Sequence, residues 1–194
     1  MIRILNLVLY SFFLMCLPLK AQNMASVEAI FPLGVSFVYG IDYHPKWYTQ
    51  LKPNVVPSFG GGSSGNWFSA TYGLAIEQRY YYNMLKRQEQ GKKTVHKSAN
   101  YFSVKSAYGY SHYLKHYLDE AYDWHICTLT VNWGLRRAFG KRFYFDGSIS
   151  AGFSYNTYDT HYGSIAHSLG YYTPSEHHWQ PLFGIDLSIG YKLF

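Results

Sequence analysis

Apolar and polar residues alternate with a period of two along most of the chain. The pattern is clearest over residues 124–156, which we interpret as one long antiparallel hairpin. Each arm runs beyond the usual ~5–6 residues of a globular strand and carries aromatic residues near its ends. This combination predicts a hairpin that crosses a membrane. The two faces of its second arm are Phe143, Phe145, Ile149, Ala151, Phe153 and Tyr155 against Tyr144, Asp146, Ser148, Ser150, Ser154 and Asn156.

The same alternation predicts five further crossings, which makes seven with the two arms of the hairpin. They are residues 27–43, 48–59, 67–82, 101–112 and 180–194. The second of these is weak because it contains Pro53 and Pro57, and proline cannot donate a ladder hydrogen bond, so part of it should be irregular or lie at an edge. Bacterial single-chain barrels have an even number of strands. The eighth strand arises either from a break near residues 32–34 or from a short strand within residues 165–172.

A closed barrel is the architecture that this pattern favours. In lipid an unpaired strand edge costs several kcal/mol per orphan polar group, so a spanning sheet must close on itself. We therefore predict an all-β fold over residues 22–194, a transmembrane antiparallel up-and-down β-barrel of eight strands. Both termini would lie in the periplasm, with outer loops at residues 61–66, 113–123 and 157–178. A soluble secreted barrel with an apolar inner cavity stays open as an alternative, because alternation alone does not tell inside from outside.

The first 21 residues have the pattern of a secretory signal peptide. Arg3 precedes an apolar run over residues 4–17, and Ala21 ends a plausible cleavage site. Cys16 raises a lipoprotein alternative, which Met15 before it disfavours. After the signal only Cys127 remains, so no intrachain disulfide is expected. No later run approaches the ~20 apolar residues of a membrane helix.

Composition adds support for aromatic-rich strands and excludes one class of partner. Aromatic residues make up 20% of the chain and charged residues 14%, with 21 Tyr and 17 Gly. The 17 Lys and Arg exceed the 11 acidic residues, but two of the basic residues belong to the predicted signal. The remaining charge is mildly basic and no single basic face is apparent, so nucleic acid is not an expected partner.

Short motifs from the third crossing onward carry a family resemblance. They are Arg79-Tyr80-Tyr81-Tyr82-Asn83, Lys86-Arg87, Gly91-Lys92, Ser98, Asn100-Tyr101, Asn132-Trp133-Gly134-Leu135-Arg136-Arg137 and Gly190-Tyr191. In these words the chain resembles an uncharacterised family of small Gram-negative outer-membrane β-barrel proteins. The resemblance implies a cell outer membrane location and brings no catalytic residues. The last strand, which ends at Phe194, also resembles the C-terminal signal read by the barrel-assembly machinery, although its apolar phase falls on Leu193.

The polar faces of the predicted strands collect charges of both signs. An eight-stranded barrel is just wide enough to be filled by side chains, so these charges should pair across the lumen and close it. An ion path would need a wider barrel. The predicted lumen network consists of Asp42, Glu77, Arg79, Lys105, Arg136, Asp146 and Asp186.

The predicted loop 157–178 holds the residues of an alternative function. His167, Ser168 and Glu176 have the chemistry of an acyl-transfer site, as in enzymes that modify lipid A or phospholipid, where Ser attacks and His takes its proton. The motifs of those enzymes are missing here. The neighbours His177 and His178 would point to opposite faces of a strand, which disfavours zinc. We therefore expect a surface loop, with no catalytic residue, cofactor or metal.

The expected role is structural or interactive at the cell surface. Outer-membrane lipid, lipopolysaccharide and the barrel-assembly machinery are the expected partners, and the pattern does not identify an extracellular one. Aromatic residues near predicted strand ends suit the headgroup level of a membrane, where amphipathic rings are favoured. They are Trp47, Trp67, Tyr80, Tyr81, Tyr82, Trp124, Tyr171, Tyr172 and Trp179.

Overall fold

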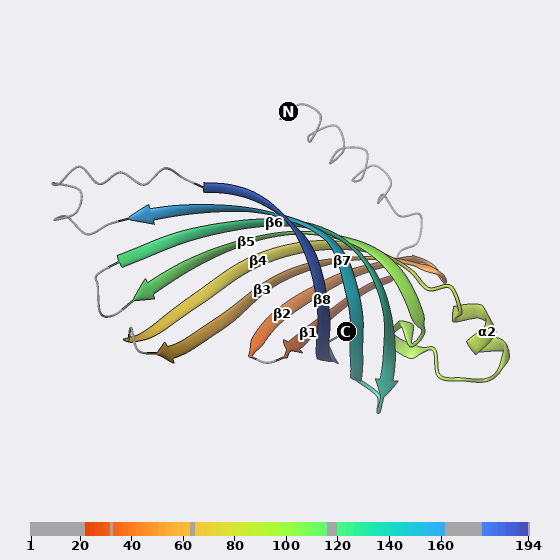
Figure 1. The fold of residues 1–194 in the computed structure, drawn as a ribbon. Coiled ribbons are helices and arrows are strands. Elements are labelled where there is room, and N and C mark those ends of the chain that lie inside the picture. The colour runs from red at the N-terminus through yellow and green to blue at the C-terminus, as the bar shows by residue number, and fades with distance from the viewer. Residues whose placement is uncertain (1–21, 32, 63–64, 116–119, 162–175, 194) are drawn as a thin grey trace, which may run out of the picture.

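The computed structural model describes residues 22–31, 33–62, 65–115, 120–161 and 176–193, and these form an eight-stranded barrel. Each strand pairs antiparallel with the next, and β1 pairs with β8, which closes the sheet (Figure 1). The predicted all-β, up-and-down, eight-stranded architecture is confirmed. The strands are β1 (Gln22–Ile30), β2 (Gly34–His44), β3 (Trp47–Gly62), β4 (Gly65–Tyr80), β5 (Asn100–Lys115), β6 (Glu120–Phe139), β7 (Phe143–His161) and β8 (Glu176–Lys192).

The eighth strand comes from the first predicted segment, which is two strands and not one. The chain reverses between Ile30 and Gly34, which pair with each other. This confirms one of the two alternatives that the sequence left open. Residues 165–172, the other alternative, lie outside the described residues, as does the predicted signal peptide.

The strands extend further than the sequence predicted, so the predicted outer loops were too long. β3 and β4 pair as far as Gly62 and Gly65, and β5 and β6 pair as far as Lys115 and Glu120. β7 continues to residue 161 and β8 begins at residue 176. Polar residues at strand ends caused the error, because antiparallel pairing satisfies the backbone there whatever the side chains are.

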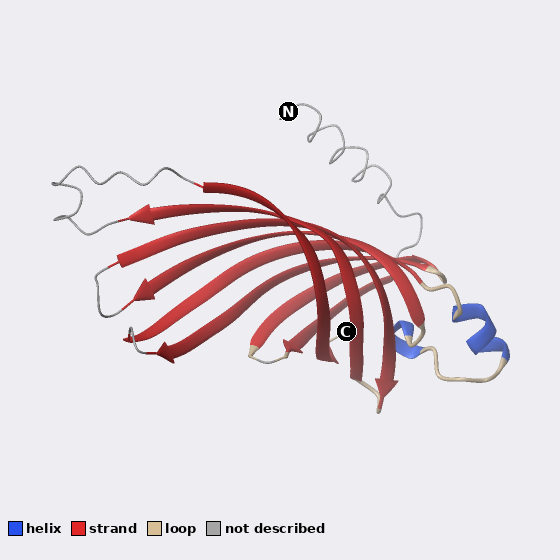
Figure 2. Cartoon of the chain, viewed as in Figure 1, coloured by secondary structure: helices blue, strands red, loops and turns tan. Residues whose placement is uncertain are grey.

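The connection between β4 and β5 folds against one end of the barrel. It contains α2 (Met84–Glu89) and the 3₁₀ turn η1 (Val95–Lys97), which are the only helical elements of the described residues (Figure 2). Met84, His96, Lys97 and Ala99 are buried. The second part of this connection, residues 94–99, thus packs against the barrel although the connection is rich in basic residues, and we call it the end cap.

The outer face of the barrel is apolar and the inner face is polar. Ser26, Glu28, Gln50, Glu77, Arg79, Asn132, Arg136 and Asp146 are buried inside, between outward residues that are exposed. The sequence left open which face of the strands lines the interior. The polar face does so, whereas an apolar inner cavity would require the apolar residues to point inward. The outward apolar residues include Val27, Val35, Leu51, Leu74, Val104, Leu129, Val131, Ile149, Phe153, Phe183, Ile185 and Ile189. No helix among the described residues is long and apolar enough to span a membrane.

Tyrosine rings and glycines complement each other inside the barrel, near the end that carries α2. Tyr101 pairs with Gly134, and Tyr144 pairs with Gly190. A Cβ atom built on either glycine would overlap the ring of its tyrosine. A Cβ atom built on Gly40 would likewise overlap the ring of Tyr48. Large and small residues thus alternate around the wall, which is how a narrow barrel accommodates rings in its interior.

We expect Gly190→Ala to lower the free energy of unfolding by about 1–3 kcal/mol, because the added methyl group overpacks the ring of Tyr144. Gly184→Ala is the matched control, since Gly184 lies on the same strand and its Cβ would meet only Ser150 Oγ, at 3.0 Å. Urea unfolding in detergent micelles, followed by tryptophan fluorescence, measures both. Equal effects of the two substitutions would contradict the packing argument.

Candidate functional site

Charged side chains from five strands meet inside the barrel. We call Glu28, Lys52, Glu77, Arg79, Arg136 and Asp146 the ionic cluster. All of them face inward, and every one except Lys52 has at most 5% of its side chain exposed. Their inward direction follows from the alternation of side chains along a strand, because each of them lies on the polar face of its strand.

Asp146 stands at the centre of the ionic cluster. Its Oδ2 accepts from Arg79 Nη1 at 2.5 Å and from Arg136 Nε at 2.6 Å, while Arg136 Nη2 lies 2.6 Å away. The hydroxyl of Tyr101 donates to Oδ1 at 2.6 Å. One carboxylate therefore holds two guanidinium groups together, with charge-assisted bonds of the strong kind.

Glu77 is the second carboxylate of the ionic cluster. Its Oε1 lies 2.9 Å from Arg79 Nε and accepts from Ser103 Oγ at 2.6 Å. Its Oε2 accepts from Gln50 Nε2 at 2.5 Å. These contacts join β3, β4 and β5 through side chains as well as through their ladders.

Glu28 completes the ionic cluster and was not among the predicted network residues. Tyr144 donates to its Oε1 at 2.9 Å, Lys52 Nζ lies 2.7 Å from Oε2, and Arg136 Nη2 lies 3.5 Å from Oε1. The signal that could have identified Glu28 is its phase. It shares the inward face with Ser26, and breaking the first segment at residues 31–33 leaves both on the polar side of β1.

The ionic cluster is electrically balanced and stacked against aromatic rings. Three carboxylates face two guanidinium groups and one ammonium group. Arg79 lies over the Tyr101 ring at 4.0 Å, and Arg136 lies over the Tyr144 ring at 4.4 Å. Charge balance and burial together make this part of the interior a closed polar core.

The seven predicted network residues fall in three places. Glu77, Arg79, Arg136 and Asp146 belong to the ionic cluster. Lys105 and Asp186 form a separate ion pair at 2.5 Å, where the Asp186 side chain is 53% exposed. Asp42 pairs with Lys97 of the end cap at 2.7 Å.

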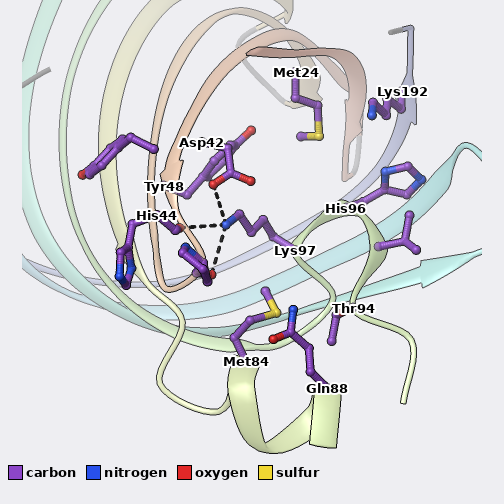
Figure 3. A pocket seen from close by; sticks show the side chains of 13 residues that line it. Met24, Asp42, His44, Tyr48, Met84, Gln88, Thr94, His96, Lys97 and Lys192 are labelled. Carbon is purple, nitrogen blue, oxygen red and sulfur yellow. Dashed lines mark hydrogen bonds and ion pairs between the residues drawn. The ribbon is translucent and has the colours of Figure 1, made fainter. Parts of the chain in front are cut away.

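Lys97 fastens the end cap to the β2–β3 turn. Its Nζ binds Asp42 and donates to the carbonyl oxygens of His44 and Pro45, each at 3.0 Å (Figure 3). Burial lowers the pKa of Lys97, and the hydrogen bond with Asp42 opposes that shift. The backbone of His96 and Lys97 is left-handed, with φ of 56° and 57°, which is strained for residues with side chains.

A cavity of about 540 Å³ opens between the end cap and the barrel wall. Met24, Met84 and Tyr48 form its apolar side, and Asp42, Lys97 and Lys192 its polar side (Figure 3). His96 Nε2 lies 2.9 Å from the Lys141 carbonyl oxygen. Burial lowers the pKa of His96, which favours the neutral ring, while the hydrogen bond to Lys141 raises it.

A second cavity, of about 230 Å³, lies inside the barrel on the other side of the ionic cluster. It is lined by residues of seven strands, β1 to β5, β7 and β8. Its polar lining is Glu28, Ser36, Lys52, Asn54, Glu77, Arg79, Lys105, Asp146, Ser148, Asp186 and Ser188.

The residues of the predicted acyl-transfer alternative are not brought together by the described part of the chain. His167 and Ser168 lie outside it. Glu176 begins β8, where its backbone pairs with Tyr158. Within the described ranges no three His, Cys, Asp or Glu side chains gather in a way that could hold a metal ion.

Comparison of the chain with family models, with curated proteins and with solved structures finds no match. The resemblance to an uncharacterised outer-membrane family therefore stays a prediction from the motifs alone. What the geometry itself establishes is an eight-stranded antiparallel barrel with an apolar exterior and a charged, closed interior.

Proposed function

We propose that this chain is an integral outer-membrane β-barrel protein with a closed polar core, acting in a structural or surface-interaction role through the loops at one end. The observation that carries the proposal is the apolar outer face. Soluble monomers rarely expose a contiguous apolar patch larger than a few hundred Å². Here outward apolar residues succeed one another on all eight strands, which suits a lipid environment.

Aromatic pairs at the two ends of the barrel support this proposal. Trp47 packs on Tyr80, and Phe143 packs on both Phe139 and Tyr191, at the end that carries α2. At the opposite end Tyr155 packs on Trp179. Two such levels are the pattern of interfacial girdles. Tyr81 does not belong to them, because its side chain is wholly buried in the interior.

The closed interior favours a structural or interactive role over transport. The ionic cluster and the tyrosine rings fill the lumen next to the end cap, and their charges cancel. A conducting pore would need an unfilled path past these groups. The working surface is then the end opposite α2, where β3 to β8 extend furthest and residues 116–119 and 162–175 connect them.

We further propose the orientation that the sequence suggested. The termini of the barrel and α2 lie on the same side, which would be the periplasm, and the opposite end would face outward. β8 would present the C-terminal signal to the barrel-assembly machinery. Outer-membrane lipid and lipopolysaccharide would surround the wall.

The proposal predicts a heat-modifiable protein in the outer-membrane fraction. Unboiled samples should migrate faster on SDS gels than boiled ones, because a closed sheet with a buried ionic cluster resists SDS at room temperature. The protein should leave the membrane only with detergent. Gel mobility of fractionated cells, with and without boiling, makes the measurement.

Two results would contradict it. If the protein appeared in the soluble fraction without detergent, a lipid environment around the outer face would be excluded. A protein that stays with the membrane but shows no mobility shift would mean that the barrel is not closed in SDS. An alkaline carbonate wash is the control, since it strips peripheral proteins and leaves embedded ones.

A further inference from the structure

The barrel wall has a notch where two short strands stand between two long ones. β1 and β2 have 9 and 11 residues, whereas β8 and β3 beside them have 17 and 16 (Figure 1). The last β1 pair joins Ile30 to Ser188, and the corresponding β2 pair joins Val35 to Val55. Beyond these points, residues 56–62 of β3 appear in the ladder with β4 alone, and residues 180–186 of β8 in the ladder with β7 alone. We call this gap the β3–β8 notch.

Prolines mark both edges of the β3–β8 notch. Pro57 lies on the open part of β3, and Pro181 lies on the open part of β8. Proline lacks the N–H that a ladder needs and is confined to edge strands or bulges. It also discourages pairing with a foreign strand. The sequence therefore keeps these edges open and does not prepare them for a ninth strand.

The rim of the notch is the most exposed apolar surface of the barrel. Among the residues whose side-chain exposure the structure describes, the five large apolar side chains with the greatest exposed fractions all flank it. They are Phe183 at 78%, Phe31 at 75%, Trp179 at 74%, Ile185 at 73% and Phe59 at 68%. Such a rim suits contact with hydrocarbon.

The inner cavity of about 230 Å³ lies directly behind the notch. Ile30, Ser36, Val56 and Ser188, which sit where the two short strands end, belong to its lining. Sites for drug-sized ligands usually measure ~300–1,000 Å³. This cavity is smaller, so it fits a small polar group and not a whole lipid.

We propose that the β3–β8 notch is a lateral portal for an acyl amphiphile with a small anionic headgroup. The headgroup occupies the inner cavity, and the chain stays in the notch against the apolar rim. This inference rests on the proposed membrane location.

Four carboxylates and three cationic side chains line the inner cavity, and Lys105 is the cation whose carboxylate partner is the most exposed and the most easily displaced by an anion. Its partner Asp186 has the more exposed side chain, 53% against 22% for the lysine. A solvent-exposed ion pair is weak, so an incoming phosphate can take the place of the aspartate on the ammonium group. Lys52 is held by the buried Glu28 and keeps its own partner. The hydroxyl groups of Ser148 and Ser188 line the same cavity and can donate further hydrogen bonds.

Native mass spectrometry of the detergent-solubilised full chain tests the portal, with lysophosphatidylglycerol as the probe. We expect one retained lipid and a dissociation constant that rises at least tenfold in Lys105→Gln. Lys141→Gln, a charge removal at the opposite end of the barrel, should change nothing. A second variant adds six alternating Thr and Val residues to each strand of the β1–β2 hairpin at its turn, which covers most of the notch and should abolish retention.

Each other outcome overturns the portal. Retention that survives both Lys105→Gln and the lengthened hairpin would mean annular lipid only. Equal retention of lysophosphatidylcholine would refute selection for an anion. A dimer in place of the lipid-bound monomer would assign the notch to a second copy of the chain. SDS gel mobility of the same samples reports separately on the proposed barrel, so a failed portal is distinguishable from a failed membrane assignment.

Discussion

Replacing Asp146 by Asn should lower the free energy of unfolding by about 3–5 kcal/mol, the largest effect that we expect from a single substitution. The side chain keeps its size, but Arg79 and Arg136 lose the carboxylate that both of them contact within 2.6 Å. Breaking a buried ion pair from one side leaves an uncompensated charge, and that charge is the source of the loss. Here two guanidinium groups are affected at once.

The matched control is Asp186→Asn, which removes a carboxylate from a partly exposed ion pair with Lys105. Exposed pairs contribute about 0–1 kcal/mol, so this variant should unfold close to the parent protein. Urea titration in micelles, combined with the temperature at which the fast-migrating SDS band is lost, measures both variants. If Asp146→Asn were as stable as Asp186→Asn, the ionic cluster would not be what holds the interior together.

Replacing Val131 by Lys should lower the free energy of unfolding by about 2–4 kcal/mol in a bilayer, the cost of a lysine on the lipid face at the midplane. Val131 lies near the middle of β6, its side chain is 61% exposed, and it pairs with Val104 and Ala151 on either side. In a barrel surrounded by water the same change would be nearly neutral, since it only adds a charge to an exposed position. The substitution therefore distinguishes the two environments.

Leu85→Lys serves as its control, because Leu85 is also exposed and apolar but lies on α2, outside the barrel wall. Leucine and lysine have similar helix propensities, so little change is expected there. Folding yield and urea unfolding in phosphatidylcholine vesicles give the comparison. A Val131→Lys protein that folds and unfolds like Leu85→Lys would exclude a lipid-facing wall.

The alternation of the sequence was sufficient to predict the fold, but not which way the strands face. Period-two patterning gave the phase of each strand, and the turn at residues 31–33 supplied the eighth strand that parity required. The pattern could not say that Val131 points outward and Asn132 inward, because either face can line a barrel. Which face points inward depends on how the whole sheet closes into a barrel, and no local sequence signal encodes that closure. Pro57 was a reliable local signal, since it does lie at an edge of the pairing.

The sequence predicted which charged side chains face the interior better than it predicted which of them contact one another. Glu77, Arg79, Arg136 and Asp146 meet because their inward phase brings them to one level of the barrel. Asp42 shares that phase but lies at the end cap, where it pairs with Lys97. Lys105 lies opposite Glu77 in the β4–β5 ladder but pairs with Asp186 of β8, and such a choice of partner depends on how the strands meet across the barrel. Burial of the end cap had no sequence signal, because its 3₁₀ turn has only three residues and so short a segment shows no apolar period.

The ladder between β1 and β8 contains five residue pairs, from Ser26–Lys192 to Ile30–Ser188, whereas β6 and β7 share nineteen. Those five pairs join positions about 160 residues apart along the chain, so their formation carries the largest loop-closure penalty in the sheet. We expect this junction to form last and to separate first. A folding intermediate would then be a curled, open sheet of seven established ladders whose free edges are its two terminal strands.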